Sequence, residues 1–209
     1  MIQFASANSG EGVSTVAREF ARLAAVRARK PVWLIDADLA NQGQQETIAA
    51  DVERFGRISP PAAASPDGTI FYAVTPPIMG RDGKPVDPGR LMTARACLGG
   101  RLWVTRFSTE SLRSGQKAEP LSDPRYWDAM RRHADTIVID APAADRNDAA
   151  IILAPYVDAT ILVVAAETTA ANEPVILRDE IEAVGGRIAG VVVNRSTYKA
   201  PGFLKRLVG

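Results

Sequence analysis

Residues able to bind phosphate stand near the N-terminus, in the stretch SANSGEGVST (residues 6–15). Gly10 and Gly12 permit backbone conformations that a Cβ atom would block, so successive N–H groups can point at phosphate oxygens. Ser14 stands where a phosphate loop places its Mg²⁺-binding hydroxyl. The stretch follows a short apolar run and opens a segment of helical period, which is the context such a loop requires. The predicted binding residues are Gly10, Glu11, Gly12, Val13, Ser14 and Thr15.

The loop departs from the standard pattern G-x-x-x-x-G-K-[ST] at two positions. Ala7 stands at the first glycine position, and Val13 stands where the pattern has its lysine. Because valine has no charge, the loop lacks the cation that usually contacts the β- and γ-phosphates. A glycine turn followed by a helix cap, with no ligand, explains the same residues, and the sequence alone leaves both explanations open.

Carboxylates follow two apolar runs that have the composition of buried strands: Asp36 and Asp38 come after VWLI, and Asp140 comes after TIVI. Ligands bind at the carboxyl ends of strands in open α/β sheets, so these groups are predicted to meet there. Asp36 would orient a water or a nucleophile. Mg²⁺ would be held by Ser14, Asp38 and Asp140. Helix caps, or ion pairs with a nearby arginine, are the structural alternative for the carboxylates.

A fourth pattern is GVVVNRS, in which an apolar strand runs into Asn194. The amide of an asparagine at a strand end can hold the edge of an adenine ring through its donor and acceptor groups. An ordinary turn asparagine explains the same position. Asn194 is therefore a candidate contact to an adenine ring only when it is considered together with the other three patterns.

The elements that must position these residues alternate along the chain. The predicted strands are 2–6, 32–35, 69–74, 101–107, 137–139, 159–165 and 188–193, and the predicted helices are 14–29 and 172–184. Continuous apolar strands separated by helices indicate a parallel sheet covered on both faces. We therefore predict an α/β fold: a doubly wound, mainly parallel sheet with helices on both faces.

The segment 56–100 differs from the rest because Pro- and Gly-containing turn signals recur through it. It offers few apolar residues for a core of its own. We interpret it as an elaborated loop region with some extra β structure, within a single domain spanning residues 1–209.

The composition excludes several classes of protein. Among 209 residues, 25 Lys and Arg balance 24 Asp and Glu, so the net charge of +1 argues against nucleic acid as a partner. Five of the cations are Lys and 20 are Arg, and no Lys precedes Lys30. One Cys and one His exclude a disulfide framework and a site built on two histidines. No apolar run can span a bilayer and no secretory signal is visible, so the chain is expected to be cytoplasmic.

In this order and spacing, the four patterns resemble the MinD/ParA-type branch of P-loop ATPases. Within that branch the chain is most similar to the bacterial tyrosine kinases that control capsule and exopolysaccharide synthesis. SANSGEGVST resembles that family's loop with the motif P-G-E-G-K-S-T, LIDADLA its L-I-D-A-D-x-R, and TIVIDAPAADRNDAAIILAPYVDATILVV its I-I-D-T-P-P and following segment. The resemblance covers residues 1–55 and 101–198.

The resemblance implies specific roles. It makes Asp36, Asp38 and Asp140 the carboxylates for Mg²⁺ and water, Ser14 a Mg²⁺ ligand and Asn194 an adenine contact. It implies ATP or ADP with Mg²⁺ as cofactor, bound weakly or not at all without the lysine. It also implies an integral-membrane polysaccharide chain-length or export protein as partner, homo-oligomers, and a peripheral location at the inner membrane through that partner.

Two departures from the family pattern leave three hypotheses. Val13 replaces the loop lysine, and where family kinases end in a tyrosine cluster this chain has Tyr198. The first hypothesis is a degenerate, kinase-like regulator of polysaccharide synthesis or export. The second is a working ATPase or kinase in which Arg146, Arg195 or a neighbouring subunit supplies the cation. The third is an ATP-dependent dimeric switch of the MinD/ParA type, against which Asn8 counts because those proteins carry a lysine at this position.

Overall fold

The computed structural model describes residues 1–80, 83–85, 88–166 and 168–196. Within them, the main sheet has eight strands in the order β10-β9-β1-β8-β2-β6-β5-β3. The strands from β10 to β6 run parallel, and β5 and β3 continue the sheet antiparallel. These strands are β1 (Ile2–Ala5), β2 (Val32–Asp36), β3 (Ala62–Ala63), β5 (Met92–Cys97), β6 (Leu102–Phe107), β8 (Thr136–Asp140), β9 (Ala159–Ala165) and β10 (Ile188–Asn194).

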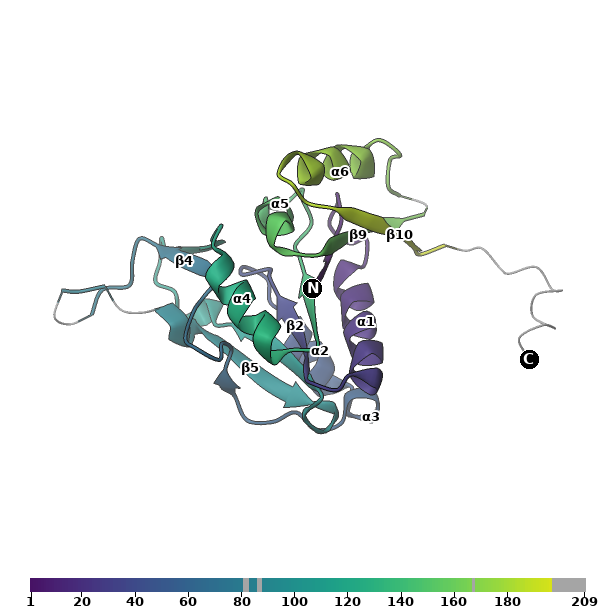
Figure 1. The fold of residues 1–209 in the computed structure, drawn as a ribbon. Coiled ribbons are helices and arrows are strands. Elements are labelled where there is room, and N and C mark those ends of the chain that lie inside the picture. Colours follow the sequence, from purple (N-terminus) through teal and green to yellow (C-terminus); the bar gives the residue numbers. More distant parts are fainter. Residues whose placement is uncertain (81–82, 86–87, 167, 197–209) are drawn as a thin grey trace.

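Helices cover both faces of this sheet, so the predicted α/β fold is confirmed (Figure 1). The α-helices are α1 (Val13–Arg27), α2 (Gln44–Ala50), α3 (Val52–Phe55), α4 (Pro124–His133), α5 (Ala149–Leu153) and α6 (Glu173–Ala183). Helix α1 packs with α2 and α3 against one face, in a cluster that includes Phe4, Leu34 and Val104. Helix α4 packs on the other face against Ile35 and Ile139.

The burial of α1 follows directly from its sequence. Val13, Ala17, Ala21 and Ala25 recur at every fourth position and are all buried, so they form one apolar stripe along the helix. Small alanines allow the helix to lie close to the sheet. This close packing fixes the start of α1, and with it the end of the predicted phosphate loop, beside the carboxyl end of β1.

Segment 56–100 contributes a strand and buried side chains to the main fold, which a surface loop would not do. The extra β structure expected in this segment includes strand β5, which extends the main sheet beside β6 and whose position was not predicted. The predicted strand 69–74 corresponds to β4 (Tyr72–Thr75), which pairs with β7 (Lys117–Pro120) in a separate two-stranded sheet. Phe71 and Met92 are buried with α4, so this segment shares the core of the main sheet.

No helix in the described part of the chain is long and apolar enough to cross a membrane. Tyr198 lies outside the described residues.

Candidate nucleotide-binding site

The predicted phosphate loop connects β1 to α1 and has the backbone that phosphate binding requires. Gly10 and Gly12 have φ angles of +85° and +95°, which side chains rarely adopt. Among the described residues, the main-chain N–H groups from Gly10 to Ser14 have no hydrogen-bond partner. The loop surrounds a cavity of about 260 Å³, which we call the loop cavity. Successive free N–H groups around such a cavity provide an anion-binding geometry.

Val13 belongs to the core as well as to the loop. Its side chain is 7% exposed and packs in the apolar cluster that contains Phe4 and Ala17. The same residue lines the loop cavity. The position of the usual lysine is therefore filled by a side chain that continues the hydrophobic core and presents no charge to a phosphate.

Carboxylates from three segments hold the loop in shape. The buried carboxylate of Glu11 accepts hydrogen bonds from the N–H of Asn8 (3.1 Å) and from the hydroxyl of Thr169. Asp145 accepts from both the N–H and the hydroxyl of Ser9, at 2.9 and 2.8 Å. Glu173, at the start of α6, accepts from the side-chain amide of Asn8 at 2.5 Å. The predicted binding residue Glu11 thus commits its side chain to supporting the loop, and its main-chain N–H is the group it offers a ligand.

Asn194 lies against the loop at the end of β10. Its Nδ2 donates to the main-chain oxygen of Glu11 at 2.8 Å, and its Oδ1 accepts from the N–H of Arg195 at 2.9 Å. These bonds bring the predicted adenine contact into the site but engage both ends of its amide with the protein. A role for Asn194 toward adenine stays a prediction.

The three predicted carboxylates meet beside the loop. They line a second cavity of about 250 Å³, the acidic cavity, together with Ser14. Asp36 and Asp140 are register partners on the adjacent strands β2 and β8. The convergence expected from strand ends is therefore observed, and its residues are Ser14, Asp36, Asp38 and Asp140.

Asp36 is buried, and its carboxylate caps α2. Its Oδ2 accepts from the N–H groups of Gly43 and Gln44, both at 3.2 Å. Burial raises the pKa of Asp36 well above its usual value, and the nearby charge of Asp140 raises it further. The contacts at Asp36 are those of a structural cap, and its role in orienting a water stays a prediction.

Asp140 differs from Asp36 and Asp38 in having a carboxylate oxygen that accepts no hydrogen bond from the described residues. Burial raises the pKa of Asp140 to about 6, while hydrogen bonding from Gln44 and Ser14 opposes the rise. Its Oδ2 accepts from Gln44 Nε2 at 2.6 Å, whereas its buried Oδ1 has no partner among the described residues. Asp140 Oδ1 is therefore an acceptor available to a ligand or a water.

Gln44 is a site residue that sequence reasoning missed. Its Nε2 donates to the main-chain oxygen of Ser14 (2.8 Å) as well as to Asp140, and its Oε1 accepts from Arg18 (3.1 Å). It is buried at the first position of α2. The available signal was the polar run QGQQ (residues 42–45), two positions after LIDADLA, because buried amides there have backbone groups to satisfy.

Three arginines approach the two cavities. Arg146 lines both and pairs with Asp38, with 2.5 Å between Nη2 and Oδ2. Arg195, with φ +54°, lines the loop cavity, and Arg18 lines the acidic cavity. Arg146 and Arg195 were predicted as replacement cations, and both lie at the loop cavity; Arg18 was not predicted.

The predicted Mg²⁺ ligands fit a metal poorly in this arrangement. Asp38 Oδ1 accepts from the N–H groups of Ala40 and Asn41 at 3.2 and 3.0 Å, and its Oδ2 faces Arg146. In the part of the chain that the structure describes, no three His, Cys, Asp or Glu residues form a metal-binding group. Of the predicted ligands, Ser14 and Asp140 keep an oxygen that could face a metal.

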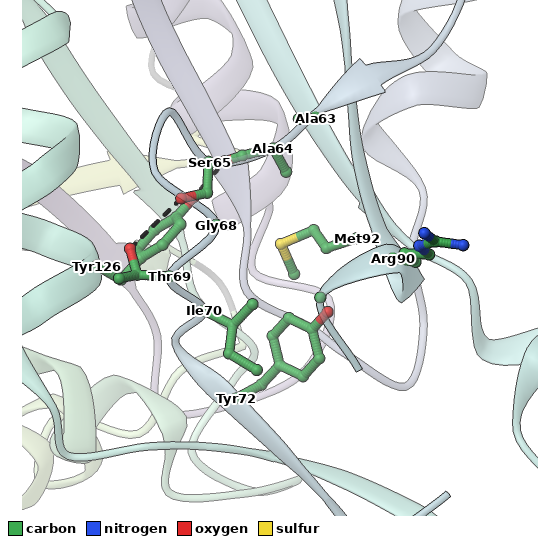
Figure 2. A pocket seen from close by; sticks show the side chains of 11 residues that line it. Ala63, Ala64, Ser65, Gly68, Thr69, Ile70, Tyr72, Arg90, Met92 and Tyr126 are labelled. Carbon is green, nitrogen blue, oxygen red and sulfur yellow. Dashed lines mark hydrogen bonds between the residues drawn. The ribbon is translucent and has the colours of Figure 1, made fainter. Parts of the chain in front are cut away.

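A third cavity, of about 190 Å³, lies away from the loop, between the segment 56–100 and Tyr126 of α4 (Figure 2). Met92 and Ile70 form its apolar wall. The hydroxyls of Tyr72 and Tyr126 donate to the main-chain oxygens of Pro88 and Ala64, at 2.7 and 3.1 Å. Both phenols thus connect segments of the protein, and the cavity offers no cluster of catalytic groups like that at the loop.

The fold is a mainly parallel α/β sheet in which the glycine loop connects β1 to α1. No family model matches the sequence, and no curated protein matches it either. Several solved structures are similar to this chain over most of their own length.

The kinase domain of VpsO is similar over 94% of this chain and 84% of its own, with a TM-score of 0.59 and 22% identity. The kinase domain of the Escherichia coli tyrosine kinase ETK has a TM-score of 0.58 at 16% identity, covering 96% of this chain and 69% of its own. MinD from Aquifex aeolicus has a TM-score of 0.54 at 20% identity, covering 98% and 72%. These neighbours come from the two groups that the sequence motifs resemble, and at these identities they confirm the fold.

Proposed function

We propose that this protein is a degenerate, tyrosine-kinase-like regulator of exopolysaccharide or capsule synthesis or export. Its loop would bind ATP or ADP weakly and would not carry out efficient phosphoryl transfer. It would act by docking on an integral-membrane chain-length or export protein, and so lie peripherally at the inner membrane. The likeness of fold and motifs to bacterial tyrosine-kinase domains supports the biological setting.

The observation that carries the proposal is the position of Val13. The loop keeps two glycines in the left-handed conformation, main-chain N–H groups without a partner among the described residues, and a cavity. An apolar residue that is 7% exposed stands in place of the lysine. Catalysis of phosphoryl transfer depends on positioning and on electrostatic stabilisation of the transferring group. Losing one charged hydrogen bond costs ground-state binding about 1.5–3 kcal/mol. Binding can therefore survive a change that removes most of the catalysis.

Titration calorimetry with ATP and Mg²⁺, beside a hydrolysis assay, tests the biochemical half of the proposal. We expect weak binding and no turnover by the wild type, and binding at least tenfold tighter by Val13→Lys, because the new ammonium enters the loop cavity. Val16→Lys is the matched control, since it adds the same charge one turn along α1 at a residue that lines neither cavity. Tight binding with turnover by the wild type would contradict the proposal.

Deletion of the gene in its own organism tests the regulatory half. We expect the amount or chain length of the surface polysaccharide to change, and both the wild type and Val13→Ile to restore it. Unaltered polysaccharide after deletion would exclude the regulatory role and leave nucleotide binding untouched.

An active enzyme with a replacement cation is the second candidate. Arg146 and Arg195 favour it because both line the loop cavity. An ATP turnover that survives in the wild type and is lost in Arg195→Ala would establish this candidate in place of the first.

A further inference from the structure

We propose that Arg146 takes the place of Mg²⁺ in this site, so that the loop holds the phosphates of its ligand without a divalent metal. The inference rests on the proposed function, because it concerns how the same loop binds a nucleotide. Three features of the site carry it: where Arg146 lies, what Asp38 contacts, and which donors Arg146 keeps available.

Arg146 lies at the border between the loop cavity and the acidic cavity. The residues that line both cavities are Ser14, Ala141 and Arg146. In a P-loop site, Mg²⁺ occupies this kind of border, between the loop hydroxyl, the phosphate oxygens and the carboxylates at the strand ends. Here the border already holds a guanidinium group with a permanent positive charge.

Asp38 is engaged with the protein on both oxygens. Two main-chain N–H groups, from Ala40 and Asn41, bind Oδ1, and Arg146 Nη2 lies 2.5 Å from Oδ2. Asp38 is itself buried, so this ion pair is only partly screened by solvent. A Mg²⁺ ion at the border would have to displace the guanidinium from Asp38 and would then be repelled by it.

Arg146 still has donors to offer a phosphate. A guanidinium carries five N–H groups in a planar fork, and the ion pair with Asp38 involves the Nη2 end. Among the described residues, Arg146 has no other ion pair. The fork matches two phosphate oxygens, so one side chain can bridge Asp38 and a phosphate at the same time. The free N–H groups from Gly10 to Ser14 complete an anion site that needs no metal.

The test is the affinity for ADP, measured by titration calorimetry in EDTA and again in excess Mg²⁺. We expect the two dissociation constants of the wild type to agree within about threefold. In EDTA, Arg146→Ala should bind ADP at least tenfold more weakly, because a charged hydrogen bond is lost. Arg146→Lys should recover part of the affinity. Asp38→Asn should bind ADP at least as tightly as the wild type. If Asp38 instead supported a bound Mg²⁺, the same substitution would weaken ADP binding in excess Mg²⁺.

Arg131→Ala is the matched control. Arg131 is exposed to the same degree as Arg146, at 38% against 39%, and pairs with an aspartate, Asp158, at 2.8 Å. It lines neither cavity, so its loss should leave ADP affinity unchanged. Binding that requires Mg²⁺, or that Arg146→Ala leaves intact, overturns the inference while nucleotide binding by the loop stands. No ADP binding in either buffer overturns both the inference and the proposed function.

Discussion

Asn194 lies so close to Gly12 that a Cβ atom on Gly12 would stand 2.1 Å from Asn194 Nδ2. The side-chain amide of Asn194 thus occupies the space that the glycine leaves, and it donates there to the main-chain oxygen of Glu11. The end of β10 and the phosphate loop therefore depend on each other for their shape. Gly12 is required for its conformation, with φ +95°, and also for the room it leaves.

Gly12→Ala should lower the free energy of unfolding by about 2–4 kcal/mol, from backbone strain together with the displaced amide of Asn194. Gly10→Ala is the control: Gly10 has a similar φ of +85°, but a Cβ atom there would meet nothing within 4 Å. It should cost about 1–2 kcal/mol, from strain alone. Urea denaturation of the two variants measures the difference, and equal losses would show that the contact with Asn194 contributes nothing.

Gln44→Met should lower the free energy of unfolding by about 2–4 kcal/mol, although the side-chain volume is nearly kept. The variant removes the hydrogen bonds to Ser14 and Asp140, and the buried carboxylate of Asp140 loses the amide that donates to its Oδ2. Gln116→Met is the control, because its amide bonds lie at the surface, and it should change stability by less than about 1 kcal/mol. Similar effects from the two substitutions would mean that Gln44 does not organise the site.

The positions of the carboxylates were predictable because each follows the end of an apolar strand in the sequence. Parallel strands place their carboxyl ends at one edge of the sheet, so Asp36 and Asp140 had to meet once their strands were adjacent. The glycine loop was predictable for the same reason: its residues are contiguous in the sequence.

The partners of these groups were not predictable, because they come from distant parts of the chain. Asp38 pairs with Arg146, and Asn194 bonds to Glu11, and neither pairing follows from spacing. Strand β5 was missed because its sequence, MTARAC, is short, contains small residues and has an arginine in its middle. Its place is set by pairing with β6, which is a tertiary effect.

Asp140 should make stability depend on pH between about 6 and about 4. The pKa of Asp140 in the folded protein is about 6, above the value near 4 of an unfolded chain, so the folded state holds the proton more tightly. Stability from this group is present at low pH and is lost as the pH rises through 6. Asp140→Asn should therefore be more stable than the wild type at pH 7, by about 1–3 kcal/mol, with an advantage that shrinks toward pH 4.

Urea denaturation of Asp140→Asn and the wild type at several pH values between 4.5 and 7.5 (roughly the titration window) measures this dependence. Asp128→Asn is the control, since it makes the same substitution at an exposed residue of α4, away from the site. A difference between Asp140→Asn and the wild type that stays constant across the range would show that Asp140 does not titrate in this window.

Tyr126 should be needed to hold the segment 56–100 on the main core. Its buried hydroxyl donates to the main-chain oxygen of Ala64 at 3.1 Å, and Tyr126→Phe would leave that oxygen without its donor. We expect a loss of about 1–2 kcal/mol in the free energy of unfolding. Tyr156→Phe is the control, because its hydroxyl contacts Ser122 at an exposed position, and it should cost less than about 0.5 kcal/mol. If the two variants unfold at the same urea concentration, the hydrogen bond from Tyr126 does not stabilise the segment.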